Sequence, residues 1–379
     1  MVNSLVTWSF PTTIVFGVGA VSTVAEQVRR IGARRALIVC DPGIVKVGIA
    51  ERVRALLEGN GVAASVFDHV DPNPVEPNVL DGVAAYRAHE AGCVVAVGGG
   101  SPLDVGKLIA LKVTHDRPLA DYDDAADGGR FIGPNVPPVV TIPTTAGTGS
   151  EVGRSGVVTL AATGRKTVIF SPHLLARAAL LDPELTRTMP ARVTAATGFD
   201  ALTHCLEAFC SLGDHPMADA IALGGLELCA ANLVRAIEQG NDLDARGGMM
   251  KAAMMGAVAF QKGLGACHSL AHPLSSEKGL HHGLANALCL PAVLDFNESV
   301  ATAKLDRVRR ILDEGARNCG QAVRALRKRA HLPEGLAAEG VTEVDIPKLS
   351  DKAFEDACRL SNPRPTTRED LALLYRASL

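Results

Sequence analysis

Short apolar runs alternate with segments of helical pattern through the first half of the chain, and this alternation restricts the fold more than any other feature of the sequence. The apolar runs lie at residues 36–40, 64–68, 93–97, 138–143 and 178–182. Strands that alternate with helices form βαβ units, in which neighbouring strands run parallel. We therefore predict an α/β domain over residues 1–187, built on a parallel, Rossmann-like sheet.

The second half of the chain has a different pattern. After about Pro190, alanine, leucine and methionine recur at helical spacing, most clearly at residues 191–211, 218–238 and 249–260. This periodicity predicts an all-helical domain over residues 188–379. A chain of 379 residues of which 47% are hydrophobic can fill two separate cores.

Charge and hydropathy exclude several classes of partner. The chain has 38 basic and 41 acidic residues, without a basic run interleaved with aromatic residues, so we expect no nucleic-acid partner. The longest apolar stretches are far shorter than the roughly 20 residues that cross a bilayer, and the start of the chain lacks the pattern of a signal peptide. We therefore expect a cytoplasmic protein with no membrane partner. None of the nine cysteines forms a CxxC pair, which predicts reduced thiols.

A glycine-rich turn follows the apolar run at 93–97. Gly98, Gly99, Gly100 and Ser101 lie in the order strand, turn and helix start. Glycines let a pyrophosphate approach the backbone N–H groups, and the positive start of the helix attracts its charge. Ser101 can cap the helix and donate to a phosphate. A tight turn without a ligand is the alternative, although a turn alone rarely needs three successive glycines.

Two further features point to a dinucleotide. The loop at 143–151 follows a strand and carries Thr144, Thr145 and Thr148, whose hydroxyls suit ribose and phosphate oxygens, unless the loop is merely polar. Asp41 ends an apolar run, where a carboxylate can accept both hydroxyls of an adenosine ribose and repel a 2′-phosphate. In that role Asp41 favours NAD over NADP, whereas an aspartate that only begins an Asp-Pro-Gly turn has no such consequence.

The dinucleotide fingerprint GxGxxG is absent from the chain. Gly17 and Gly19, with Ser22, form only a weak imitation of it. We interpret this segment as the exit of a hairpin followed by a helix cap.

Acidic and imidazole side chains gather in the helical half, at one-turn spacing on two predicted helices and in one adjacent pair. These residues are Asp200, His204, His268, His272, His281 and His282. Residues one turn apart project from the same face of a helix. One carboxylate and three imidazoles from separate helices form a site suited to Fe²⁺, Zn²⁺ or another divalent ion, with room for a substrate oxygen. A single histidine is more often a packing residue, but the joint pattern favours a metal site.

Long motifs resemble those of the iron-dependent alcohol dehydrogenase family. They are GGGSPLDVGK at 98–107, PTTAGTGSE at 143–151, the segment from DPELTRTMP to LEAF at 182–209, GLGACHSLAHPLSSEKGLHHG at 263–283 and NPRPTTREDLALLYRASL at 362–379. Their order and spacing are similar to those of the family over nearly the whole chain. The resemblance implies a dehydroquinate synthase-like α/β domain followed by an all-helical metal-binding domain.

The resemblance also assigns roles to individual residues. The implied metal ligands are Asp200, His204, His268 and His282. His282 is preferred over His281 because Gly283 follows it. His272 matches a histidine next to the substrate that takes part in proton relay, and is the implied catalytic residue. The implied nucleotide contacts are Asp41, Gly98, Gly99, Gly100, Ser101, Thr144, Thr145, Thr148 and Lys166.

By this resemblance the chain is expected to be an NAD-dependent alcohol dehydrogenase, with NADP less favoured, Fe²⁺ as the expected metal and at least a homodimer as the assembly. Hydride would pass between the nicotinamide and the carbinol carbon of a small alcohol. Lys262 and Arg154 stand where relatives differ and allow an anionic substrate. The alternatives are a metal-independent reductase of the maleylacetate type and a dehydroquinate synthase-like lyase that uses NAD transiently. The retained ligand set argues against the first, and the lack of an assembled basic cluster argues against the second.

Overall fold

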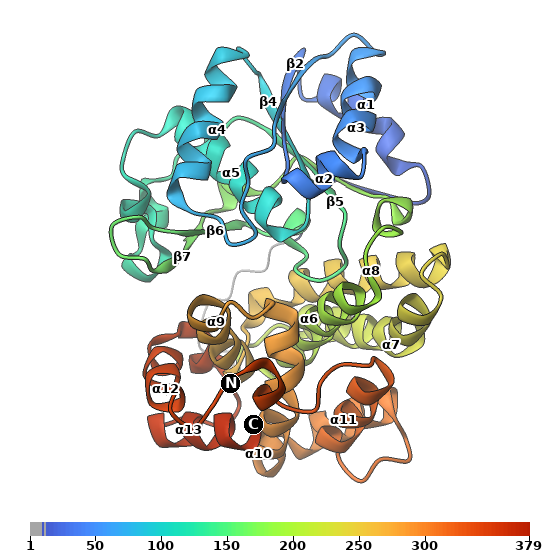
Figure 1. Cartoon of the computed structure of the whole chain (residues 1–379), viewed down its shortest axis with the longest axis vertical. Helices are drawn as coiled ribbons and strands as arrows, with labels where there is room; N and C mark the ends of the chain where they lie inside the picture. Colours follow the sequence, from blue (N-terminus) through green and yellow to red (C-terminus); the bar gives the residue numbers. More distant parts are fainter. Residues whose placement is uncertain (1–9, 11–12) are drawn as a thin grey trace. The chain divides into compact units, whose positions relative to one another are not determined.

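The structure, a computed structural model, describes residue 10 and residues 13–379 and divides into two compact units. The α/β unit comprises the described residues from Thr13 to Thr145, with Gly149–Thr188 (Figure 1). The helical unit comprises Phe10, Ala146–Thr148 and Met189–Leu379. The division after Thr188 falls next to the boundary inferred from sequence, but the assignment of 146–148 to the helical unit had no signal in the sequence. The expectation that the chain has no signal peptide rests on its first residues, and most of these lie outside the described residues.

The α/β unit is built on one parallel sheet of six strands in the order β1-β8-β5-β4-β2-β3. The strands are β1 (Thr13–Phe16), β2 (Arg35–Val39), β3 (Ala63–Phe67), β4 (Cys93–Gly98), β5 (Val139–Pro143) and β8 (Ala178–Leu181). Every neighbouring pair in this sheet is parallel, and the predicted parallel sheet is confirmed. All five apolar runs of the sequence coincide with strands.

One local prediction is wrong. The segment before Gly17 is not part of a hairpin, because β1 pairs in parallel with β8, far along the chain. Gly17 and Gly19 form the turn that follows β1, and the N–H of Gly19 donates to Asp182 Oδ1 at 3.1 Å. The Ser22 hydroxyl donates back to the Gly19 carbonyl, so it does not cap a helix.

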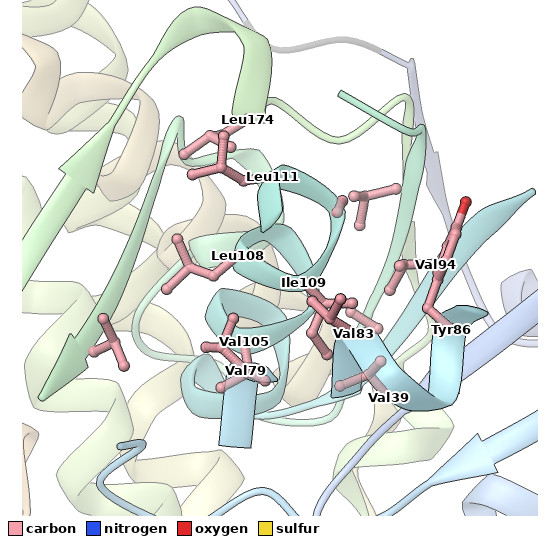
Figure 2. Packing of buried hydrophobic residues seen from close by; sticks show 14 of the residues in the cluster. Val39, Val79, Val83, Tyr86, Val94, Val105, Leu108, Ile109, Leu111 and Leu174 are labelled. Atoms are coloured by element: carbon pink, nitrogen blue, oxygen red, sulfur yellow. The ribbon is translucent and has the colours of Figure 1, made fainter. Parts of the chain in front are cut away.

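Helices cover both faces of the sheet. They are α1 (Val24–Arg30), α2 (Pro42–Lys46), α3 (Ile49–Glu58), α4 (Glu76–Ala88) and α5 (Gly100–Thr114), with the short 3₁₀ helices η1 (Ala20–Thr23), η2 (Leu119–Tyr122), η3 (Asp124–Ala126), η4 (Gly128–Phe131), η5 (Ser150–Val152), η6 (Pro172–Leu174) and η7 (Pro183–Thr186). Successive strand residues face opposite sides. Val39 and Val94 pack with Leu108 of α5 in one cluster (Figure 2), whereas Ile38 and Val95 pack with α1 and α3 in another.

A two-stranded antiparallel hairpin, β6 (Ser155–Thr159) and β7 (Lys166–Phe170), interrupts the α/β pattern. A buried lysine of α5 holds its start. Lys107 Nζ donates to the carbonyl oxygens of Ser150 and Ser155, at 2.6 and 2.9 Å. Asp104, one turn earlier, accepts from the Ser150 hydroxyl at 2.5 Å and from the Val157 N–H at 3.2 Å. These contacts join α5, the loop after β5 and the hairpin.

The described residues of the helical unit form helices and loops without a strand, which confirms the predicted helical class. The helices are α6 (Ala191–Cys210), α7 (Pro216–Glu238), α8 (Leu243–Ala259), α9 (Ala266–Lys278), α10 (His282–Leu312), α11 (Cys319–Arg329), α12 (Ile346–Glu355) and α13 (Arg368–Ala377), with η8 (Phe260–Lys262), η9 (Leu336–Glu339) and η10 (Ala357–Ser361). Helix α6 is buried along nearly its whole length and packs against α7, α8 and α10. A Cβ added at Gly256 of α8 would lie 2.9 Å from the Cβ of His204, so this glycine lets α8 approach α6 closely.

One helix, α7, is long and apolar enough to cross a membrane by length and composition alone. Half of its most apolar window is buried within the helical unit, where α7 lies along α6 and α8. Packing on these two helices accounts for its apolar composition.

Replacement of Lys107 by methionine is expected to destabilise the α/β unit by about 3–5 kcal/mol, because it removes a fully buried cation and leaves the partly buried Asp104 carboxylate without it. Urea unfolding measures this loss. Lys112→Met on the same helix is the control, since Lys112 is partly exposed and donates to two loop carbonyls. Equal losses for the two variants would contradict the role assigned to Lys107.

Candidate active site

Three histidines predicted as metal ligands converge on one carboxylate oxygen of the fourth predicted ligand, Asp200, in the helical unit. Asp200 and His204 lie one turn apart on α6, His268 lies near the start of α9 and His282 begins α10. The distances from Asp200 Oδ1 to Nε2 are 3.8 Å for His204, 4.0 Å for His268 and 3.5 Å for His282. Ligand atoms of Asp200, His204 and His268 all lie within 4.8 Å of one another. Three helices thus bring together residues that are far apart in the sequence.

The donor set fits a divalent cation. Asp200, His204 and His268 are at most 5% exposed, and burial lowers the pKa of His204 to about 4, so its imidazole is neutral at neutral pH. His268 Nε2 is buried and has no hydrogen-bond partner among the described residues. A buried carboxylate beside the neutral imidazole of His204 and the unsatisfied Nε2 of His268 fits a divalent ion that prefers nitrogen and oxygen ligands.

The adjacent histidines are distinguished by their positions. His282 Nε2 approaches Asp200, whereas His281 is the residue before α10 and is exposed. A Cβ at Gly283 would clash with the carbonyl oxygen of Ala196 on α6. The glycine therefore lets the first turn of α10 lie directly on α6, with His282 beside Asp200.

Two polar residues that the sequence interpretation missed orient the site. Glu207 Oε2 accepts a hydrogen bond from His268 Nδ1 at 2.6 Å, and its Oε1 accepts from the Cys267 N–H at 2.7 Å. Because Nδ1 carries the proton, Nε2 of His268 presents its lone pair toward Asp200. Asn286 Nδ2 donates to Asp200 Oδ1 at 2.9 Å. The only signal in the sequence is their position, Glu207 about one turn after His204 and Asn286 one turn after His282.

His272 lies next to these residues. Its ring is stacked on that of His282, with centroids 5.2 Å apart and an interplanar angle of 12°. Its Nδ1 lies 2.7 Å from Asp356 Oδ2, and the side chain is about one third exposed, at 32%. His272 is therefore beside the cluster and accessible from outside it.

The cysteines near the ligands are packing residues in this structure. Cys205 and Cys267 are buried, and burial raises the pKa of the Cys205 thiol to about 12. Their thiols point to backbone carbonyls, of Ala252 and Asn286 respectively. All nine cysteines lie in the described part of the chain and are free, as predicted.

In the α/β unit, the predicted nucleotide residues gather where neighbouring strands end. The Thr144 N–H donates to the Gly98 carbonyl at 2.9 Å, which joins the loops that follow β4 and β5. A Cβ at Gly98 would lie 3.4 Å from Asp41 Oδ2, and one at Gly99 would lie 3.4 Å from Thr145 Cγ2. Gly98 also has a φ of +148°, which a side chain would strain. This edge exposes backbone N–H groups at the start of α5.

The turn interpretation of Asp41 is confirmed, and its role at the ribose stays a prediction. One carboxylate oxygen accepts from the Ile44 N–H at 3.1 Å and caps α2, as in a simple turn. The other oxygen lies toward Gly98. Thr148 belongs to the segment that packs with the helical unit, and Lys166 begins β7. Their places at the nucleotide stay predictions.

The prediction that Ser101 caps α5 is wrong. The residue before the helix is Gly99, and the Ser101 hydroxyl donates to the carbonyl oxygen of Pro72 at 2.7 Å. Gly100 is already the first residue of α5, so Ser101 falls one position inside the helix. Its backbone N–H, rather than its hydroxyl, faces the end where an anion would bind.

Two basic residues, Lys262 and Arg154, were considered as partners for an anionic substrate. Among the described residues, Lys262 has an acidic partner and Arg154 has none. Lys262 is buried, and its ammonium group pairs with Asp219 and donates to the Phe209 carbonyl at 3.0 Å. The expectation that Lys262 could serve an anionic substrate is therefore wrong. Arg154 lies 5.1 Å from the ring centroid of Phe170, and burial lowers its pKa. Within the described part of the chain no carboxylate pairs with it.

Replacement of Glu207 by glutamine is expected to weaken metal binding roughly 10- to 100-fold, because an amide cannot hold His268 as firmly in the Nδ1–H tautomer. Chelator competition with zinc measures the affinity. Glu227→Gln, at an exposed position of α7, is the matched control and should bind zinc as the unmodified protein does. An unchanged affinity in Glu207→Gln would show that the hydrogen bond does not support the site.

Comparisons with known proteins show the family of the chain. The family described as "Iron-containing alcohol dehydrogenase" matches residues 11–183, and "Fe-containing alcohol dehydrogenase family, C-terminal" matches residues 194–379. The 4-hydroxybutyrate dehydrogenase of Cupriavidus necator is 44% identical, over 97% of this chain and 98% of its own length.

Solved structures give the same result. A crystal structure of 1,3-propanediol oxidoreductase matches with a TM-score of 0.95 and 35% identity, over 99% of this chain and all of that one. The NAD⁺ complex of sulfoacetaldehyde reductase from Bifidobacterium kashiwanohense matches with a TM-score of 0.90 and 29% identity, over 99% of both chains. Neither the lyase nor the metal-independent reductase is favoured by these matches. The chain belongs to the iron-containing alcohol dehydrogenase family and is an NAD-dependent alcohol dehydrogenase.

Proposed function

We propose that this enzyme oxidises a short hydroxy acid at its terminal alcohol, and reduces the corresponding aldehyde, with NAD and a ferrous ion. The observation that carries the reaction class is the convergence of His204, His268 and His282 on the Asp200 carboxylate. The substrate class is supported by the 44% identical relative that is named for 4-hydroxybutyrate. The sulfoacetaldehyde reductase also acts on a small molecule with an acidic group.

The metal would be held by Asp200, His204, His268 and His282. When bound, the ion supplies Lewis acidity, which makes the proton of an alcohol easier to remove and an aldehyde carbonyl more electrophilic. The ligand set suits Fe²⁺ and Zn²⁺ alike, and the family supports Fe²⁺. Glu207 and Asn286 orient His268 and Asp200, so the ligands need little rearrangement to bind.

The dinucleotide would bind at the edge where β2, β4 and β5 end. Backbone N–H groups at Gly98, Gly99, Gly100 and Ser101 would hold the pyrophosphate, and the free oxygen of Asp41 would accept from the ribose hydroxyls. NAD supplies a hydride acceptor. A carboxylate at Asp41 disfavours the 2′-phosphate of NADP. By resemblance to the family, Thr144, Thr145, Thr148 and Lys166 provide further contacts.

Two side chains would act on the substrate directly. His272 would take the alcohol proton and pass it to solvent, since it lies beside the ligands and is partly exposed. Arg154, in the α/β unit, is the candidate for the substrate carboxylate because of its place in the sequence, where relatives differ, and because it is a partly buried cation that no described carboxylate neutralises. We further propose a cytoplasmic homodimer or larger homo-oligomer, for which the resemblance is the support.

Protein purified without oxygen is expected to contain iron and to form NADH from 4-hydroxybutyrate. His268→Ala should lose the metal, because it removes a buried ligand. His272→Ala should keep the metal and lose roughly 100-fold or more in kcat, the usual contribution of a positioned acid or base. Elemental analysis and NADH absorbance measure the two effects. Full metal and full rate in both variants would disprove the assignment.

Arg154→Gln is expected to raise KM for 4-hydroxybutyrate roughly 10- to 100-fold, because the substrate carboxylate loses its charged partner. The neutral diol of the same chain length, 1,4-butanediol, should be affected little. Arg154→Lys, which keeps the charge, should have a KM for 4-hydroxybutyrate between that of the unmodified protein and that of Arg154→Gln. Equal changes for the acid and the diol would show that Arg154 does not recognise the carboxylate.

A further inference from the structure

We infer that Asp356 is a positioning residue for proton transfer, because it holds His272 in the tautomer whose Nε2 lone pair is free to accept the substrate proton. This inference rests on the relay role proposed for His272 and adds the group that makes it effective. Asp356 lies between α12 and η10, well away from His272 in the sequence.

The contact between the two side chains defines the tautomer. His272 Nδ1 and Asp356 Oδ2 are 2.7 Å apart. An ionised carboxylate only accepts hydrogen bonds, so the proton must be on Nδ1. Burial alone would raise the pKa of Asp356, but His272 and the hydrogen bonds from Ser269 and the Cys358 N–H outweigh it and hold the pKa well below its usual range.

Asp356 is itself held rigidly. Its Oδ1 accepts from the Ser269 hydroxyl at 2.7 Å and from the Cys358 N–H at 2.9 Å. The second of these contacts caps η10, and the first reaches α9, the helix that also carries His268 and His272. With Oδ1 bound to two donors, only Oδ2 is left for His272. The carboxylate therefore cannot rotate without the loss of three hydrogen bonds.

The ring of His272 is also fixed from its faces and edges. It is stacked on His282 and meets the ring of His268 edge-on at 5.9 Å. None of the hydrogen bonds among the described residues involves His272 Nε2. In the oxidation direction, the alcohol O–H bond would break and an Nε2–H bond would form, while hydride leaves for NAD. Asp356 would balance the positive charge that the imidazole gains.

The same residues could be considered as a second metal site, since ligand atoms of His272, Asp356 and Cys358 lie within 4.8 Å of one another. Burial raises the pKa of the Cys358 thiol well above its usual value, and the nearby Asp356 raises it further. A thiol that stays protonated is a poor ligand. The hydrogen bond to Asp356 also occupies Nδ1 of His272. The pair is therefore favoured over the metal site.

Asp356→Asn separates a positioning role from a structural one. The amide oxygen is expected to stay with Ser269 and the Cys358 N–H, which leaves the NH₂ group facing His272. The amide would then donate to Nδ1 and move the ring proton to Nε2. The variant should keep its metal and its NADH affinity while kcat falls roughly 100-fold or more. Glu355→Gln, an exposed neighbour, is the matched control and should leave kcat unchanged.

The tautomer is read directly by ¹⁵N-histidine NMR of the zinc-loaded protein, with His272→Gln used to assign the signal. The expected result is Nδ1–H in the unmodified protein and Nε2–H in Asp356→Asn. An unchanged kcat in Asp356→Asn would overturn the inference. An Nε2–H signal in the unmodified protein would also overturn it, and this measurement does not depend on how well the variant folds. Two zinc ions per chain would overturn it in favour of a second metal site. Full activity of His272→Ala with the expected tautomer would instead disprove the proposed relay.

Discussion

A carboxylate buried among imidazoles determines how the helical unit is built. Asp200 is only 3% exposed, and transfer of an unpaired carboxylate out of water costs several kcal/mol. Histidine nitrogens from three helices surround one of its oxygens, and the single hydrogen bond from Asn286 does not neutralise it. A bound cation would complete the charge balance, so it would stabilise the unit as well as take part in its chemistry. The close approaches of α8 and α10 to α6, at Gly256 and Gly283, serve the same arrangement.

In the α/β unit the corresponding constraint is the parallel pairing of β2, β4 and β5. Parallel neighbours end at the same edge of a sheet, so residues that follow different strands meet there. Asp41, Gly98 and Thr144 come together in this way without any direct bond between their side chains. The buried Lys107 then holds the loop after β5 and the start of the hairpin to α5. The edge proposed to bind the dinucleotide therefore depends on contacts that were not visible in the motifs alone.

Burial patterns and one-turn spacings could be predicted from the sequence, but side-chain partners across elements could not. The apolar runs predicted the strands of the parallel sheet, and the spacing of Asp200 and His204 predicted that both lie on one face of a helix. The sequence could not show that Lys262 pairs with Asp219 on another helix, which removes it from substrate binding. Glu207 and its partner His268 are similarly remote in the sequence. The hairpin β6–β7 was missed because its strands are short and only half-buried.

Two histidines on α9 show why the surroundings of a side chain decide its chemistry. His268 and His272 stand one turn apart, and each lies within hydrogen-bond distance of a carboxylate at Nδ1, Glu207 in one case and Asp356 in the other. In the neutral form of each ring the proton is therefore on Nδ1, and Nε2 carries the lone pair. For His268 this atom is buried beside Asp200, where a bound cation would satisfy it. For His272 the side chain is partly exposed, so a proton can arrive and leave. The same local hydrogen bond thus makes one histidine suited to hold a metal and the other suited to move a proton.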